Sequence, residues 1–262
     1  MKKIIAIVIS IVLVAAFAAV SVSAKTDNPN ANENGQIPEA SGDYAVPGRN
    51  DLRVRVFVHG PKAGNHRTPK PEENLVCEDN RSDAVTGWAG WKLPNSTVTY
   101  RLNQNSAPSA IRSSVPTFVS NSFSKWVNAI TLDGTTSAKP TLTPGSQTST
   151  SRARFDGQNI IAWGRTSGST LGVTYIWYYT ASKLVAEVDT IMNYRVPWNL
   201  ACSTSYYNAE NIMIHELGHW FGLDDEYDGP FVENTMYGYG SRAEMKKITP
   251  ENGDITGLNL IY

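Results

Sequence analysis

Apolar and polar positions along this chain follow patterns typical of both strands and helices. Residues 52–58 (LRVRVFV) alternate between apolar and charged side chains, which predicts a half-buried strand. Four more strands are predicted at 96–102, 159–163, 171–179 and 185–194, where β-branched or aromatic residues gather between Gly- and Ser-rich segments. The pattern leaves open whether residues 52–58 belong to the main fold or to a short propeptide.

Three other segments repeat their apolar residues at helical spacing. Residues 111–127 predict one helix face, with Pro116 separating or kinking the first turns. A second helix is expected from Asn208, a good N-cap, to Gly222. A third is expected to begin at Thr249, because a proline follows at the first helical position. The apolar residues of its buried face are Ile255, Leu258 and Ile261.

The remaining segments are polar and rich in turn-forming residues. Residues 25–50 lack periodic apolar positions, which predicts a linker or tail, and residues 131–152 are expected to form a surface loop. His59 and His66 border or lie in another turn-rich stretch, 60–73, and we expect both to face solvent.

Composition narrows the class of protein. The chain has 262 residues, 41% hydrophobic and 18% charged, with a net charge of −1 and no long basic run. This is typical of one globular domain with an N-terminal appendage, and it makes nucleic acid an unexpected partner.

The N-terminus carries a targeting signal. Lys2 and Lys3 precede an apolar run at 4–20, and small residues at 22–24 form a cleavage site, so residues 1–24 are interpreted as a signal peptide. An uncleaved membrane anchor is the alternative. We expect a secreted, extracellular monomer without stable membrane association, with a net charge of −3 once the two lysines are removed.

Two cysteines, Cys77 and Cys202, lie beyond the signal peptide. In an oxidising compartment they most simply form one disulfide. The alternative is that the Cys77 thiolate binds a metal ion and keeps an enzyme latent.

The strongest chemical signal is the segment 215–225, HELGHWFGLDD. His215 and His219 are four residues apart, so a helix places both imidazoles on one face, where they can bind one metal ion. Glu216 lies beside the first ligand, where a carboxylate can hold water and take its proton. The pattern therefore predicts one catalytic zinc ion, with Glu216 as the general base.

A catalytic zinc site normally has three protein ligands. Gly222 can adopt the left-handed conformation that ends a helix, and this brings Asp225 back towards the metal. Asp224 is the alternative third ligand. A carboxylate ligand leaves less positive charge at the metal than an imidazole would, so we expect an activity optimum at or above neutral pH.

These residues resemble the metzincin clan of zinc endopeptidases, whose signature is HExxHxxGxx followed by His or Asp and a downstream methionine turn. The Asp form at 215–225 is similar to the snapalysins, and the similarity continues to residue 230. Residues 235–238 (TMYG) resemble the methionine turn. The resemblance implies that Met236 forms a hydrophobic floor beneath the metal.

The rest of the chain resembles the matrixins, through 91–102, Trp126, 157–163 and 254–262. The resemblance covers 87–262 as the zinc metallopeptidase domain and leaves 25–86 as a linker or propeptide-like region. It implies an α+β, zincin-like fold: a twisted, mixed, mostly parallel sheet with an antiparallel edge strand, two long helices including the zinc-binding one, and a C-terminal helix.

The segment 171–179 is similar to the edge strand against which a polypeptide substrate would lie by strand addition. The substrate-binding residues implied by the resemblance are Gly172, Val173, Thr174 and Tyr239. Two positions depart from the matrixin pattern: Asp225 replaces the third histidine, and Gly238 stands where proline is common. The sequence picks out no calcium segment, since the acidic run 224–228 is more often a solvated turn, and calcium stays open as an additional ion.

Three functions are compatible with this sequence. A metalloendopeptidase is favoured, because a catalytically inactive zinc-containing binding module would not need the Glu216 carboxylate. A zinc peptidase of another clan would take its third ligand from a distant helix, for example Glu244. The Gly222 and Asp225 that follow His219 at short offsets argue against it.

Overall fold

The computed structural model describes residues 37–61, 77, 81–131 and 138–262. The expected signal peptide and His66 lie outside the described residues. A mixed sheet organises the rest, in the order β1-β2-β6-β7-β5-β3-β4, with β10 pairing to β2. Its strands are β1 Gly42–Val46, β2 Arg49–Pro61, β3 Thr97–Leu102, β4 Thr141–Pro144, β5 Asn159–Gly164, β6 Gly172–Tyr179, β7 Val185–Asn193 and β10 Tyr239–Gly240.

The sheet has a parallel half and an antiparallel half. Strands β7, β5, β3 and β4 pair in parallel, whereas β1, β2, β6 and β7 pair antiparallel. The expected strand at 171–179 is antiparallel, but it does not lie at the edge, because β2 and β1 extend the sheet beyond it. A separate two-stranded ribbon joins β8 (Trp198–Asn199) to β9 (Tyr207–Asn208).

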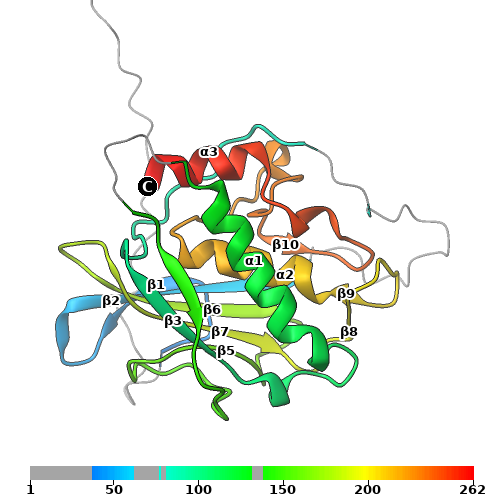
Figure 1. Cartoon of the computed structure of the whole chain (residues 1–262), viewed down its shortest axis with the longest axis horizontal. Helices are drawn as coiled ribbons and strands as arrows, with labels where there is room; N and C mark the ends of the chain where they lie inside the picture. Colours follow the sequence, from blue (N-terminus) through cyan, green and yellow to red (C-terminus); the bar gives the residue numbers. More distant parts are fainter. Residues whose placement is uncertain (1–36, 62–76, 78–80, 132–137) are drawn as a thin grey trace, which may run out of the picture.

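Three α-helices complete the α+β fold: α1 Val115–Ala129, α2 Ala209–Trp220 and α3 Asn252–Ile261. Figure 1 shows α1 and α2 crossing the same face of the sheet, with the C-terminal α3 above them. Among the described residues, four short 3₁₀ helices connect the larger elements, at Gln104–Ser106, Arg112–Ser114, Gly229–Phe231 and Lys246–Ile248.

The two faces of the sheet bury different sets of side chains, because successive strand residues point to opposite sides. The larger cluster lies between the sheet and the helices and includes Phe57, Trp163, Trp126 and Phe221. The smaller cluster contains alternate residues of the same strands, such as Val54 on β2. The Phe57 side chain therefore lies on the same side of the sheet as α2.

Several predicted boundaries need correction. Residues 42–50 are not a tail, because they form β1 and the start of β2. Part of the expected loop at 131–152 is strand β4, which pairs with β3. The helix expected at 111–127 is divided near Pro116, as the proline indicated. Residues Arg112–Ser114 form a separate 3₁₀ helix, and α1 begins at Val115.

Helix α3 begins at Asn252 rather than near Thr249, because Glu251 and Asp254 form a capping box. Of its three predicted core residues only Leu258 is fully buried.

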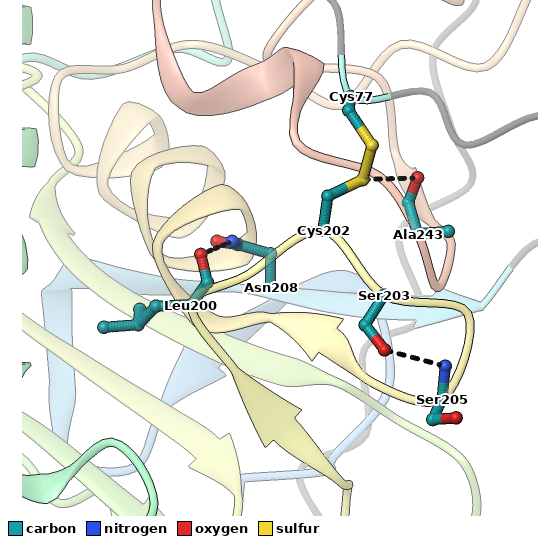
Figure 2. Close-up of a disulfide and its surroundings, with 7 residues drawn as sticks. All are labelled: Cys77, Leu200, Cys202, Ser203, Ser205, Asn208 and Ala243. Carbon is teal, nitrogen blue, oxygen red and sulfur yellow. Dashed lines mark hydrogen bonds between the residues drawn. A yellow bond between two sulfur atoms is a disulfide. The ribbon is translucent and has the colours of Figure 1, made fainter.

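A disulfide joins Cys77 to Cys202, with Cα atoms 5.9 Å apart, and Figure 2 shows the Cys202 sulfur beside the carbonyl of Ala243. The Cys77 sulfur is thus bonded in this structure rather than a free thiolate. Within the described ranges, no helix has both the length and the apolar character needed to cross a membrane.

Candidate metal centre

Helix α2 carries His215, Glu216 and His219 into the protein interior. The Asn208 side chain accepts a hydrogen bond from the Asn211 amide at 2.9 Å and so caps the helix. The ring centroids of His215 and His219 lie 4.9 Å apart, and both residues are fully buried. One rigid element therefore places both imidazoles side by side.

The chain turns sharply after the helix at Gly222, whose φ is +98°. A side chain there would meet the carbonyl oxygen of Trp91, so the position requires glycine on two grounds. The turn brings Asp225 back beneath the histidines.

Each histidine is held by its Nδ1 atom. His215 Nδ1 lies 2.8 Å from the Thr235 carbonyl, and His219 Nδ1 lies 2.8 Å from the Leu223 carbonyl. A carbonyl only accepts hydrogen bonds, so both Nδ1 atoms donate and both Nε2 atoms keep a free lone pair. This fixes the tautomer in which Nε2 binds a metal ion.

Asp225, rather than Asp224, faces these lone pairs. Asp225 Oδ1 lies 3.1 Å from His215 Nε2 and 3.5 Å from His219 Nε2. Asp224 is instead a third exposed and lies 3.6 Å from Arg55. Burial alone would raise the pKa of Asp225, but His219 and His215 hold that pKa well below its usual range.

Unpartnered buried atoms converge at this point. In the part of the chain that the structure describes, the buried side-chain atoms without a hydrogen bond include His215 Nε2, His219 Nε2, Asp225 Oδ1 and Glu216 Oε1. Such atoms are costly to bury without a partner. Two imidazole nitrogens and a carboxylate oxygen are the donor set of a catalytic zinc ion, so these residues fit zinc.

Glu216 is oriented by one of its two oxygens. Oε2 accepts a 2.6 Å hydrogen bond from the Thr174 hydroxyl, while Oε1 faces the cluster. Burial raises the pKa of Glu216 to about 7, against the opposing effects of His219 and of the Thr174 hydrogen bond. The arrangement leaves one oxygen free to take a proton.

Met236 lies beneath the helix. It is fully buried, and a side chain added at Gly218 would collide with its sulfur. The preceding residue, Thr235, receives the His215 hydrogen bond, and its own amide donates to Asp254 Oδ2 at 2.7 Å. The methionine turn therefore connects α3 to the first histidine.

His59 lies in this site, contrary to the expectation that it faces solvent. It is 1% exposed, its ring centroid is 4.0 Å from that of His215, and its Nδ1 is 3.5 Å from Glu216 Oε1. Two residues earlier, the Phe57 ring stacks on His219 at 3.7 Å. The alternation of residues 52–58, continued by one more residue, would have placed His59 on the same face as Phe57.

The predicted substrate-binding residues lie on β6 and β10, the strands that pair with β2 on the side of the site. Gly172 lies next to Glu216, where a side chain would come within 2.7 Å of Oε1, and Thr174 directs its hydroxyl to Glu216. Val173 points to the opposite face of the sheet, and Tyr239 is in β10, opposite Gly60 of β2. Strand β2 therefore pairs with both strands that carry these residues, β6 and β10.

A helix with this histidine pair, an acid between them and a carboxylate after the turn defines a metal-dependent hydrolase. The matrixin family model matches residues 90–262. The chain belongs to the matrixin family and is a zinc metallopeptidase, a hydrolase that acts on polypeptides. A search of curated proteins finds no match.

Proposed function

We propose that the protein is a secreted endopeptidase that hydrolyses peptide bonds in extended polypeptides, with His215, His219 and Asp225 holding one zinc ion. The convergence of their three unpartnered buried atoms carries this proposal. The match to the matrixin family supports the zinc peptidase part of the proposal.

When bound, zinc supplies a Lewis acid that polarises the peptide carbonyl and makes water more acidic. The rest of the chemistry belongs to Glu216. Thr174 fixes Oε2, so Oε1 is the atom that accepts the proton from the attacking water and later gives it to the leaving amine nitrogen. Burial raises the pKa of Glu216 to about 7, which suits a group that takes a proton and gives it back near neutral pH.

The proposed organisation follows the same reasoning. Residues 1–24 direct secretion and are removed, residues 25–86 precede the catalytic domain, and 87–262 form it. The disulfide between Cys77 and Cys202 supports an oxidising destination. We propose a monomer.

Zinc content and casein cleavage by the chain from Lys25 onward test this function. We expect about one zinc per chain and, once the chain is cut between Pro61 and Cys77, new internal cleavage sites in casein found by mass spectrometry, loss of cleavage with a chelator, and recovery with added zinc. A chain that binds zinc but never cuts casein, even after cleavage between Pro61 and Cys77, would instead be a zinc-containing binding module.

A further inference from the structure

Part of the chain before the family match pairs with β6, the strand expected to bind substrate. Strand β2 pairs antiparallel with β6 from Leu52, opposite Tyr179, to His59, opposite Gly172. This is the edge of β6 that a peptide substrate would need for strand addition. None of β1 or β2 falls within residues 90–262, so the hairpin is an addition to the matched fold.

The end of β2 is enclosed on its other side as well. Gly60 and Pro61 pair in parallel with Tyr239 and Gly240 of β10, and the Leu171 amide donates to the His59 carbonyl at 2.8 Å. The strand thus lies between β6 and β10, as an extended peptide does when bound between two strands.

Two side chains of β2 point at the catalytic helix and cover its metal ligands. Phe57 stacks on His219, and His59 packs edge-on against His215 with a nitrogen 3.5 Å from Glu216 Oε1. Neither ring nitrogen of His59 has a hydrogen-bond partner among the described residues. His59 thus faces the same centre as the three metal-binding atoms and fills the space beside the general base.

We propose that β1 and β2 form an inhibitory segment, in which β2 takes the place of substrate and Phe57 and His59 cover the metal centre. This inference rests on the proposed peptidase function. The intact chain is then latent, and the cleft opens when β2 leaves β6. Arg55 strengthens the closed state, because it lies 3.6 Å from Asp224 and over the Phe57 ring.

Separating the hairpin after folding gives the sharpest test. A recognition sequence for a site-specific protease is placed between Pro61 and Cys77, so the intact chain folds first and is then cut. Cutting turns an intramolecular contact with an effective concentration on the order of millimolar into a bimolecular one, so dilution to about 1 µM favours release by roughly a thousandfold.

The probe is the hydroxamate of the tripeptide Ala-Gly-Leu, and its binding is followed by the visible absorption of the cobalt-substituted protein. This readout does not depend on turnover. We expect cutting and dilution to tighten probe binding at least about tenfold, and casein cleavage to rise with it. Unchanged probe affinity, whether the hairpin leaves or stays bound, would overturn the inference.

Substitutions in the uncut chain provide the matched comparison. Phe57→Ala with His59→Ala should tighten probe binding about tenfold, whereas Val58→Ala, between them on the opposite face of the sheet, should change it less than about twofold. Equal effects of both variants would contradict a role for the two covering side chains.

The same measurements separate failure of the inference from failure of the proposed function. A cut chain that binds neither cobalt nor zinc overturns the peptidase proposal and the inference together. A cut chain that binds the probe more tightly but never cleaves casein leaves the covering role in place and removes the proposed activity.

Discussion

The Nε2 atom of His215 lies 3.1 Å from Oδ1 of Asp225, and neither atom has a hydrogen-bond partner among the described residues. A glycine turn and a carbonyl behind the imidazole produce this contact. His215 is aimed by Thr235, and Asp225 is brought back by Gly222. The geometry of this pair therefore depends on the turn after the helix as much as on the helix.

Replacing each of the two neighbouring aspartates in turn tests which one is the third zinc ligand. Asp225→Asn should weaken zinc affinity at least about 100-fold, since even residues that only support metal ligands contribute 10- to 100-fold. The control, Asp224→Asn, should retain zinc, because Asp224 faces Arg55. Competition with a zinc-sensitive dye measures both affinities, and zinc loss from the Asp224 variant alone would reverse the assignment.

Thr174→Val removes the hydrogen bond that orients Glu216. We expect kcat to fall about tenfold with little change in KM, since a hydrogen bond to a charged group contributes about 1.5–3 kcal/mol. That bond lowers the pKa of Glu216, so its loss raises the pKa and moves the acidic limb of the pH–rate profile to higher pH.

The control is Thr99→Val, a strand threonine with an exposed side chain away from the site. An unchanged acidic limb in the Thr174 variant would show that the hydroxyl does not act on Glu216.

Gly222→Ala should destabilise the fold by about 2 kcal/mol or more. Its φ of +98° strains any residue with a side chain, and an added Cβ would collide with the Trp91 carbonyl oxygen. Gly229→Ala, where nothing lies within 4 Å of the added carbon, should stay within about 0.5 kcal/mol of the wild type. Urea unfolding measures both, and equal midpoints would contradict the packing described at Gly222.

Replacing both cysteines by serine should lower the free energy of unfolding by about 2–5 kcal/mol, because the disulfide closes a sequence separation of 125 residues. The wild type should lose a similar amount in reducing agent, while the double variant should be insensitive to it. Stability that does not respond to reduction would mean that the disulfide adds little to the fold.

Local patterns predicted much of the fold. Alternation at 52–58 predicted most of β2, and the Asn208 cap with the four-residue histidine spacing predicted α2. Strand β4 carried no such signal, because it is short, polar and stabilised by pairing with β3. The start of α3 was misplaced because the capping box outweighs the preceding proline.

The position of β2 could not be read from the sequence. Its alternation indicates a strand but not a partner, and β6 lies more than a hundred residues further along the chain. A histidine at the end of such a strand, followed by Gly60 and Pro61, has the sequence character of a surface turn. Only the register with β6 and β10 places His59 beside Glu216.

In the proposed function, Glu216 acts on water at a zinc ion that His215, His219 and Asp225 hold. Zinc content and casein cleavage, measured on the wild type and on Glu216→Ala after the cut between Pro61 and Cys77, test it most directly. We predict about one zinc in both proteins and cleavage by the wild type alone. Absence of zinc from both, or equal cleavage by both, would contradict the proposed function.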